Sequence, residues 1–405
     1  MTNKLDEPSI DPSLNLNLGL GGTKLSSSTA FKLLRKSFIL PSTIFTYTLE
    51  PLIFTSWAVI PLSIRAFLSR SAWSLYLPLH RVLIGKRTAL HPSVSDEYAA
   101  LTTVMWGARL FPMTLKRMRF GLSQICCNFP PTSSYEKEDI SDPDTGVSGI
   151  YVHSAPKECK SKKVVFWIYG GAFLSGDCPG NVGLAESVAA PLSSDVFIVN
   201  YRLCPESSIN DALQDVVAGY KWLISSGRVR SGVDVQVLGI SSGGGLAVRL
   251  CQVLAADKGF PKENMPGAQV LICPWVHYDW HSLYPSMINN NVHDLVVTQS
   301  VYEYVNRKEV ILAMVGGESQ RLKVSPLGKS MSGLPRTLTV CSKHEVTCDE
   351  DTALHEKMRK EGVEAKILQR EYMCHVWCLV PMLPEAKETM DEVREWMAET
   401  WEGKE

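Results

Sequence analysis

The feature that most constrains this chain is a regular alternation, from residue 163 onward, of apolar strand-like runs with amphipathic helix-like runs. Runs that are apolar on both faces indicate strands buried on both sides, and their alternation with helices is typical of a parallel sheet. We therefore predict an α/β fold with a mostly parallel central sheet and helices on both faces. The strand-like runs are residues 163–171, 195–203, 233–241, 268–275, 336–345 and 363–372, and the helix-like runs are 208–226, 244–256, 349–361 and 384–401.

Two segments interrupt this pattern. Residues 276–335 follow a predicted strand without continuing the alternation, and an insertion of this kind usually forms a lid or a pocket wall. Residues 96–124 carry apolar side chains at helical spacing, which predicts one or two amphipathic helices. A turn-rich stretch at 130–149 then indicates a boundary. We expect a disordered tail at 1–30, an apolar helical region at 31–128, and the α/β domain at 129–405 with its insertion at 276–335.

The N-terminal apolar segment at 38–64 leaves two interpretations open. It carries one charge, Glu50, and is long enough to cross a bilayer, but Pro41, Pro51 and Pro61 interrupt it. It therefore predicts either a membrane contact or helices that cap a substrate pocket. The residues before it are partly acidic and have no apolar core, so they do not resemble a secretory signal.

Composition excludes several classes of protein. The 405 residues carry 41 Lys and Arg against 42 Asp and Glu, a net charge of -1, which argues against a nucleic-acid binder. The 11 cysteines are odd in number and show no paired zinc spacing, so we expect thiols and no metal. This pattern predicts an intracellular protein, either cytoplasmic or attached to the endoplasmic reticulum membrane.

The strongest local motif is Gly-Ile-Ser-Ser-Gly at 239–243, which ends an apolar strand and begins a helix. In that context a G-x-S-x-G sequence forms a sharp turn that exposes the serine hydroxyl. Ser241 is therefore the predicted nucleophile. The helix after it directs free N–H groups toward the same point.

A second glycine motif lies upstream, at the end of the first long strand. Backbone N–H groups in such a loop can converge on an oxyanion. The N–H groups of Gly171, Ala172 and Ser242 are the predicted donors, and Gly170 permits the turn.

A nucleophilic serine needs a base, and the base needs an acid that orients it. In this fold the acid and then the histidine follow the serine in the chain. His375 follows the last strand, at a turn into a helix, whereas the other histidines precede the serine, fall in the insertion or on a helix, or lie beside the acid. Glu345, after the penultimate strand, is the favoured acid, with Asp349 as its alternative.

These motifs, in this order, resemble the α/β-hydrolase superfamily, and within it the hormone-sensitive lipase-like carboxylesterases. That group includes arylacetamide deacetylases and steryl acetyl hydrolases. The resemblance begins near residue 161 and extends to the C-terminus. The matching motifs are IYGGAF (168–173), NYRLCPES (200–207), GISSGGGLAV (239–248), CPWVHYD (273–279), HEVTCDED (344–351) and MCHVW (373–377).

Three positions depart from the family pattern. Tyr169 replaces the histidine of the oxyanion motif, Ala172 replaces its last glycine, and Ile240 replaces the acidic residue before the serine. Backbone donors survive all three changes, and the catalytic set Ser241, Glu345 and His375 is complete.

The resemblance implies an α/β-hydrolase fold with a helical cap from the N-terminal region and the insertion. It also implies a serine esterase or deacetylase that needs no cofactor and no metal. We expect the substrate to be a hydrophobic small-molecule ester with a short acyl group, such as an ester of a sterol or a secondary metabolite. Four aromatic residues are candidate pocket residues, although they could equally be plain core: Tyr169, Phe173, Trp275 and Trp377.

Two other functions stay open on the sequence. One is a non-hydrolytic acyltransferase or a lactonase-type tailoring enzyme. The other is a small-molecule receptor on the same fold, against which the retained His375 argues. The expected partners are the ester and, through 38–64, a membrane, with no nucleic acid and an oligomeric state that the sequence does not define.

Overall fold

The computed structural model describes residues 60–108, 113–126, 131, 135–155, 163–279, 283–317 and 320–403. By its internal contacts the chain divides into Met1–Val59 and Ile60–Glu405. The first unit lies outside the described residues, and with it the predicted tail at 1–30 and most of the apolar segment at 38–64. All of the described residues belong to the second unit.

The centre of this unit is an eight-stranded sheet with the order β1-β2-β4-β3-β5-β6-β7-β8. The strands β3 to β8 run parallel to one another, whereas β2 pairs antiparallel with both β1 and β4. The strands are β1 (Glu136–Ser141), β2 (Ser148–His153), β3 (Val164–Ile168), β4 (Asp195–Val199), β5 (Val235–Ile240), β6 (Ala268–Ile272), β7 (Arg336–Ser342) and β8 (Ala365–Arg370).

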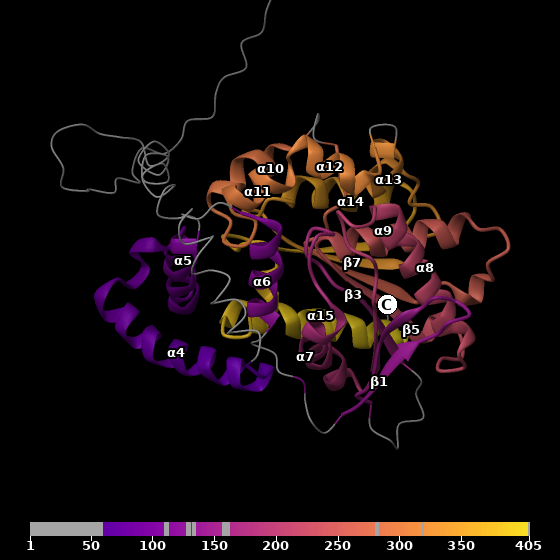
Figure 1. Ribbon diagram of the computed structural model, residues 1–405, viewed down its shortest axis with the longest axis horizontal. Coiled ribbons are helices and arrows are strands. Elements are labelled where there is room, and N and C mark those ends of the chain that lie inside the picture. Colours follow the sequence, from indigo (N-terminus) through magenta and orange to yellow (C-terminus); the bar gives the residue numbers. More distant parts are fainter. Residues whose placement is uncertain are drawn as a thin grey trace, which may run out of the picture. The chain divides into compact units, whose positions relative to one another are not determined.

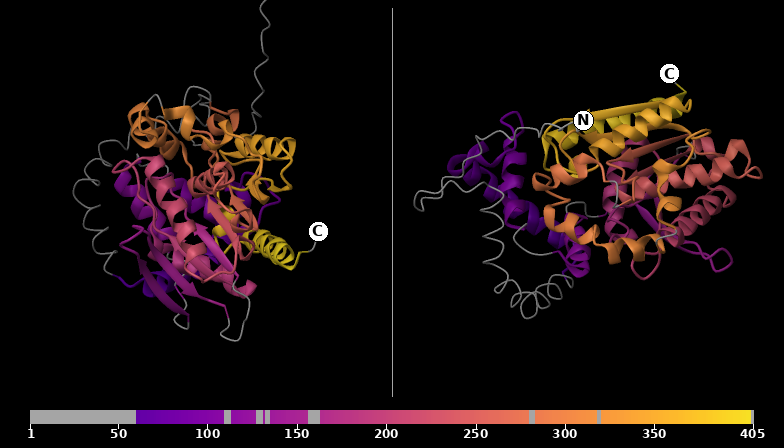
Figure 2. Two further views of the ribbon diagram at one scale, coloured as in Figure 1. Left: turned by 90° about the vertical axis from the view of Figure 1, so that its right-hand side faces the viewer. Right: turned by 90° about the horizontal axis from the view of Figure 1, so that it is seen from above.

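Helices cover both faces of this sheet. Figure 1 shows α7 and α15 on one face and α8, α9 and α14 on the other, and the two further views in Figure 2 show the same layering. These helices are α7 (Cys178–Ala189), α8 (Ile209–Ser225), α9 (Ser242–Ala256), α14 (Cys348–Lys360) and α15 (Pro384–Glu402). Because the sheet is enclosed, every residue of β3, β5 and β6 is buried. The predicted α/β-hydrolase fold is therefore confirmed.

The sheet register brings three strand ends to one edge. Ile168 at the end of β3 lies opposite Gly239 of β5, and Ile240 at the end of β5 lies opposite Ile272 of β6. In open α/β sheets, ligands bind at the carboxyl ends of the strands. The segments that leave these strands carry the predicted glycine loop and the predicted nucleophile.

Three elements, β1, β2 and α7, were not predicted from the sequence. The antiparallel pair β1 and β2 lies partly in the stretch that we interpreted as a turn-rich boundary, because β1 (Glu-Lys-Glu-Asp-Ile-Ser) is a charged edge strand with one buried residue, Ile140. Helix α7 was missed because it contains proline and glycine near its start. Asp177 caps it by accepting a hydrogen bond from the N–H of Gly180.

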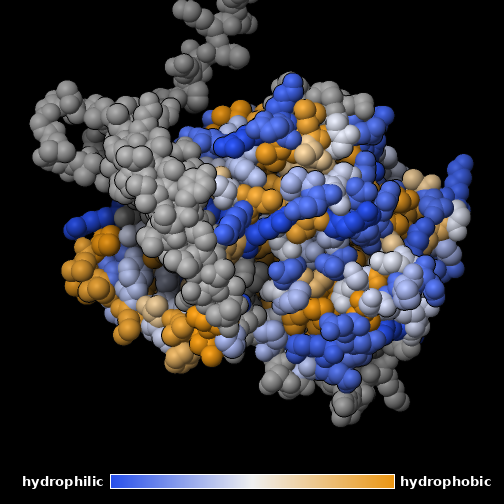
Figure 3. Space-filling model, in the orientation of Figure 1, coloured by the Kyte–Doolittle hydropathy of each residue, from blue (hydrophilic) through white to orange (hydrophobic). Residues whose placement is uncertain are grey.

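The described N-terminal region consists of α4 (Leu62–Leu83), α5 (Asp96–Ala108) and α6 (Leu115–Cys126). The stretch 96–124, predicted to form one or two amphipathic helices, forms two, α5 and α6. Apolar side chains gather on the surface over α4, where orange predominates in Figure 3. None of the helices that the structure describes combines the length and the apolar character that crossing a bilayer requires.

The insertion at 276–335 consists mainly of short helices. They are α10 (Pro285–Asn289), α11 (Gln299–Val305), α12 (Lys308–Val315) and α13 (Arg321–Val324). The hydroxyl of Ser286, in α10, donates a hydrogen bond to the carbonyl of Val346, which lies in the loop just before α14. The insertion is therefore attached to the same loop that carries the predicted acid.

Candidate active site

Ser241 occupies the sharp turn between β5 and α9. Its backbone has φ 52° and ψ −119°, a conformation that is strained for a residue with a side chain. The turn is closed by its own carbonyl, which accepts hydrogen bonds from the N–H groups of Gly244, Gly245 and Trp275. A side chain at Gly243 would come within 2.3 Å of the carbonyl oxygen of Ile168, so the two strand ends can approach only because that residue is glycine.

His375 lies in the loop after β8 and reaches Ser241 from the other side of the strand ends. Its Nε2 lies 2.8 Å from the Ser241 Oγ. Its backbone N–H donates to the Asp294 carboxylate at 2.9 Å. Asp294 is a buried residue of the insertion, and it also accepts from the N–H groups of Val296 and Val297. The insertion therefore fixes the loop that carries the histidine.

Glu345 completes the contact chain. Its Oε2 lies 2.6 Å from the His375 Nδ1, and its Oε1 accepts a hydrogen bond from the N–H of Ser342. The Glu345 side chain has no exposed surface. Asp349, the alternative acid, instead accepts a hydrogen bond from the N–H of Ser286 in α10. Of the two predicted acids, the structure brings Glu345 to the histidine.

The acidic groups around His375 stabilise its charged imidazole more strongly than burial destabilises it. Burial alone would lower the pKa of His375, but the hydrogen bond and charge of Glu345, together with the charge of Asp294, raise it above its usual value. A histidine in this setting can accept a proton from a hydroxyl while the nearby carboxylate stabilises the resulting positive charge.

Two further residues, Thr347 and Asp351, extend the hydrogen-bonded chain beyond Glu345. The Thr347 hydroxyl lies 3.0 Å from Glu345 Oε2 and 3.0 Å from Asp351 Oδ2. Asp351 is fully buried in α14, where burial and the neighbouring charges of Glu345 and Glu350 raise its pKa well above the usual range. Neither Thr347 nor Asp294 was among the predicted site residues. Thr347 is only two residues beyond Glu345, whereas no sequence signal marks Asp294.

The glycine loop, residues 170–176, lies directly beside the serine turn. A side chain at Gly170 would come within 3.1 Å of the Ser241 Cβ, which shows how closely the two backbones pack. The backbone has positive φ at Gly171 (130°), Ala172 (55°) and Phe173 (61°). Among the described residues, no protein acceptor takes the N–H of Gly171 or Ala172, whereas the Phe173 N–H donates to the Ser242 Oγ at 3.1 Å.

The four predicted pocket aromatics are all buried. Phe173 has no exposed surface and packs in a ring cluster with Trp275 and Tyr278. Trp377 also has no exposed surface. Tyr169, in the position of the family histidine, stacks on Tyr201 with ring centroids 4.3 Å apart. These contacts are those of core residues, and the role of the four as pocket residues stays a prediction.

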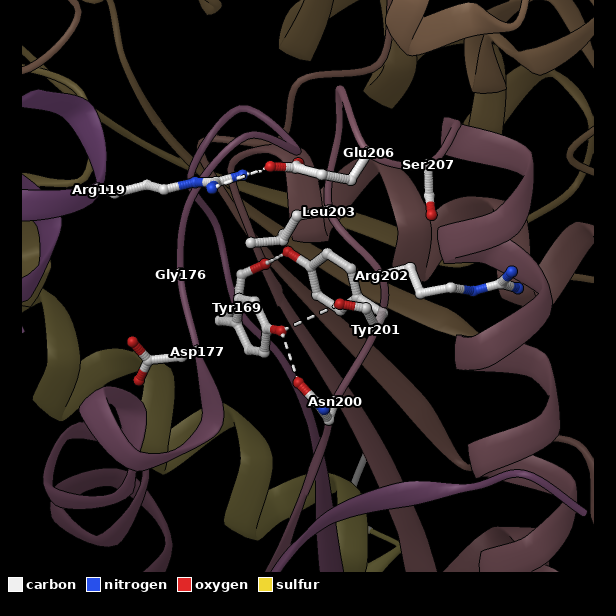
Figure 4. Close-up of a pocket in the computed structure, with 10 residues that line it drawn as sticks. All are labelled: Arg119, Tyr169, Gly176, Asp177, Asn200, Tyr201, Arg202, Leu203, Glu206 and Ser207. Atoms are coloured by element: carbon white, nitrogen blue, oxygen red, sulfur yellow. Dashed lines mark hydrogen bonds and ion pairs between the residues drawn. The ribbon is translucent and has the colours of Figure 1, made fainter. Parts of the chain in front are cut away.

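A surface hollow of about 440 Å³ borders the glycine loop at Gly176 (Figure 4). Two ion pairs involve its lining residues, Arg119 with Glu206 and Arg202 with Asp215. Tyr169 and Gly176 line the hollow, but Ser241, Glu345 and His375 do not. The lining residues are Arg119, Tyr169, Gly176, Asp177, Asn200, Tyr201, Arg202, Leu203, Glu206 and Ser207.

One group of side chains has the spacing of a metal site: Cys273, Glu345 and His375 offer ligand atoms within 4.8 Å of one another. The chemistry of these residues does not fit a metal. Both ring nitrogens of His375 already contact Ser241 and Glu345, and burial raises the pKa of the Cys273 thiol well above its usual range. A metal ion would need the thiolate and would displace the serine contact.

A serine at a sharp strand-to-helix turn, within hydrogen-bond distance of a histidine that contacts a buried carboxylate, defines the arrangement of a serine hydrolase. The family model described as "alpha/beta hydrolase fold" matches residues 165–379, more than half of the chain. The chain belongs to this family, and the resemblance predicted from its motifs is confirmed.

Curated relatives and solved structures agree with this assignment. The chain is 27% identical over 276 residues to esterase LipU of Mycobacterium tuberculosis, covering 66% of this chain and 89% of the relative. It is 26% identical over 230 residues to an acetyl-hydrolase of Streptomyces hygroscopicus, covering 56% and 73%. An esterase crystal structure from the bacterial hormone-sensitive lipase family has the same fold, with a TM-score of 0.64 and 23% identity, covering 74% and 98%.

Proposed function

We propose that this carboxylic ester hydrolase uses Ser241 as its nucleophile, His375 as its general base and Glu345 as the acid that orients the histidine. The observation that carries the proposal is the continuous contact chain from Ser241 Oγ to His375 Nε2 at 2.8 Å and from His375 Nδ1 to Glu345 Oε2 at 2.6 Å. These are the distances over which a proton moves between a hydroxyl and an imidazole.

The reaction proceeds in two acyl-transfer steps. Ser241 Oγ attacks the ester carbonyl carbon while His375 takes the hydroxyl proton, and His375 then returns that proton to the leaving alcohol as the C–O bond breaks. Water next attacks the acyl-serine and gives a proton to His375. His375 then returns that proton to Ser241 Oγ as the bond between the acyl carbon and Oγ breaks, which releases the carboxylic acid and restores the serine hydroxyl. Glu345 holds the imidazole tautomer and stabilises its charged form throughout. This chemistry requires no cofactor and no metal.

The oxyanion of each tetrahedral intermediate is bound by backbone N–H groups. The proposed donors are Gly171 and Ala172 of the glycine loop and Ser242 at the start of α9, with Gly170 allowing the close approach of the loop to Ser241. The absence of a protein acceptor for the first two N–H groups, among the described residues, supports this role. Because the donors belong to the backbone, the replacement of the family histidine by Tyr169 leaves them in place.

For the substrate, we propose a short acyl ester, such as an acetate, of a hydrophobic small molecule such as a sterol or a secondary metabolite. The relative from Streptomyces hygroscopicus is an acetyl-hydrolase, which supports the short acyl group. Buried aromatic rings beside the site, among them Phe173 and Trp275, favour an apolar alcohol over a polar one. An acyltransferase or a lactonase would use the same three residues, with another nucleophile or a cyclic ester.

We also propose an intracellular location, in the cytoplasm or at the endoplasmic reticulum membrane. The eight cysteines whose side chains the structure describes are all free and buried, which suits a reducing compartment. Membrane contact through 38–64 remains part of this proposal.

The catalytic assignment is tested by covalent labelling with a fluorophosphonate probe. We expect the native protein to be labelled and Ser241→Ala to lose both labelling and ester hydrolysis, with kcat falling by about three or more orders of magnitude. Ser187→Ala, at an exposed position of α7, is the matched control and should behave as the native protein. Labelling that survives in Ser241→Ala would show that another residue is the nucleophile. A native protein that neither reacts nor hydrolyses would favour the receptor alternative.

The acyl part is tested with p-nitrophenyl acetate, butyrate and octanoate compared side by side. We expect kcat/KM to be highest for the acetate and to fall with chain length, because a site for a short acyl group has no room for extra methylenes. A preference for the octanoate would contradict the short-acyl proposal while leaving the catalytic residues untouched.

A further inference from the structure

Helix α4 presents an apolar face to the outside of the molecule. Seven of its large hydrophobic residues are between 43% and 83% exposed, whereas globular proteins normally turn such a face toward their core. They recur at the three- and four-residue spacing that places side chains on one side of a helix. The seven are Ile64, Phe67, Leu68, Leu75, Leu79, Val82 and Leu83, and the surface over α4 is correspondingly orange in Figure 3.

The opposite face of α4 is the one that attaches it to the rest of the unit. Tyr76 donates to the carbonyl of Ala100, and the His80 Nε2 lies 2.9 Å from the Thr103 hydroxyl. Near the end of the helix, Arg81 contacts Asp96 and Glu97 at the start of α5. These contacts to α5 fix the rotation of α4, so the apolar face cannot turn inward without breaking them.

The charge of this region is mainly basic. Residues 60–97 contain five Lys or Arg residues and two acids, Asp96 and Glu97, both of which pair with Arg81. Three of the cations, Arg65, Arg70 and Arg81, are on α4 itself, and Lys86 and Arg87 follow in the next turn. A helix with an apolar outer face and a basic surrounding is the pattern of a segment that lies in a membrane surface and attracts anionic lipids.

We propose that α4 is an interfacial helix that seats its apolar face in the surface of an anionic phospholipid bilayer, parallel to that surface. This inference concerns a surface that contains none of the proposed catalytic residues, and it does not depend on them. It would place the enzyme where apolar esters accumulate.

The proposal is tested by vesicle flotation of the full chain. We expect the native protein to float with mixed phosphatidylcholine and phosphatidylserine vesicles and to float much less with phosphatidylcholine alone. Val82→Glu, the most exposed of the seven positions, should lower the partition coefficient about tenfold or more, because it places a charge in the acyl region. Val233→Glu, a 64% exposed valine beside β5, is the matched control and should float as the native protein does.

Three results would overturn the proposal. The first is equal flotation of the Val82→Glu and native proteins, which would leave 38–64 or another segment as the contact. The second is a native oligomer that Val82→Glu converts to a monomer, which would show that a second copy covers the face. The third is a clear fall in melting temperature in Val82→Glu but not in Val233→Glu, which would show that the chain itself covers it. Hydrolysis of soluble p-nitrophenyl acetate should be unchanged in both variants, so failure here is distinguishable from failure of the catalytic assignment.

Discussion

Thr347 carries one hydroxyl hydrogen, yet its Oγ1 is 3.0 Å from a carboxylate oxygen on each of two acids, Glu345 and Asp351. A hydroxyl can donate only one hydrogen bond, so the second contact needs a proton from a carboxyl group. Glu345 faces His375 and is the acid that must carry charge. Asp351 is fully buried, its Oδ1 has no hydrogen-bond partner among the described residues, and its pKa is raised, so we expect Asp351 to be the protonated group.

This assignment makes a charge-neutral substitution informative. If Asp351 is already neutral, Asp351→Asn keeps a donor toward Thr347 and changes no charge, so we expect the acid limb of the kcat/KM profile to stay at the same pH. If Asp351 were charged, the substitution would remove a negative charge near His375. The acid limb would then move to lower pH by on the order of one unit. The pH dependence of p-nitrophenyl acetate hydrolysis decides between the two.

Thr347→Val removes the hydroxyl that supports Glu345. A hydrogen bond to a charged group contributes about 1.5–3 kcal/mol, so we expect kcat/KM to fall about tenfold or more. Thr347→Ser keeps the hydroxyl and should recover most of the activity. A larger loss in Thr347→Ser than in Thr347→Val, measured with matched melting temperatures, would mean that the methyl group matters more than the hydrogen bond.

The raised pKa of His375 determines how ester hydrolysis should depend on pH. Burial opposes the charged imidazole, but Glu345 and Asp294 outweigh it, so the imidazole becomes protonated at a higher pH than an ordinary histidine. A general base works only when it is neutral. Activity should therefore be full well above that pKa and lost as pH falls through it, at a pH above the usual histidine range.

At the scale of elements, Arg119 links α6 to the glycine loop. Its Nε donates to the carbonyl of Leu174 at 2.9 Å, its Nη2 lies 3.4 Å from the carbonyl of Cys204, and its guanidinium pairs with Glu206. The N–H of Cys204 in turn donates to the carbonyl of Phe173. The proposed oxyanion donors therefore lie in a loop whose position depends on the N-terminal region.

Arg119→Ala should lower kcat about tenfold with little change in melting temperature, because it releases a loop that the rest of the fold does not need. The exposed ion pair itself contributes only about 0–1 kcal/mol, so Glu206→Gln is the matched control and should have a small effect. Steady-state kinetics and thermal unfolding of both variants test this. Equal losses of kcat in the two would assign the effect to the ion pair instead of the backbone contact.

An element could be predicted from the sequence only where its own residues carry a clear pattern. The strands that are buried on both faces were predicted because their apolar runs are continuous. The charged edge strand β1 and the glycine-rich helix α7 were missed because their order comes from pairing with β2 and from the Asp177 cap. The same holds at the site: Ser241, Glu345 and His375 each follow a recognisable strand, but Arg119, Asp294 and Asp351 contact the site only through the tertiary fold.

At the scale of the molecule, the site is assembled from distant parts of one unit. The N-terminal region supplies Arg119, the insertion supplies Asp294, and the ends of β5, β7 and β8 lead to the three proposed catalytic residues. The predicted cap from the N-terminal region and the insertion corresponds to two segments that each contact a loop of the site. No pattern along the chain could have shown which of their residues make those contacts, because each lies far in sequence from the loop it meets.

The buried cysteine thiols affect how the folded protein reacts with oxidants and alkylating reagents. The eight cysteines whose side chains the structure describes are free and buried, and burial raises the pKa of Cys251, for example, to about 12. A thiol that is neither ionised nor reachable reacts slowly with oxidants and alkylating reagents. These eight thiols should therefore react slowly in the folded enzyme and become reactive only as the structure opens, which makes them intrinsic reporters of its unfolding.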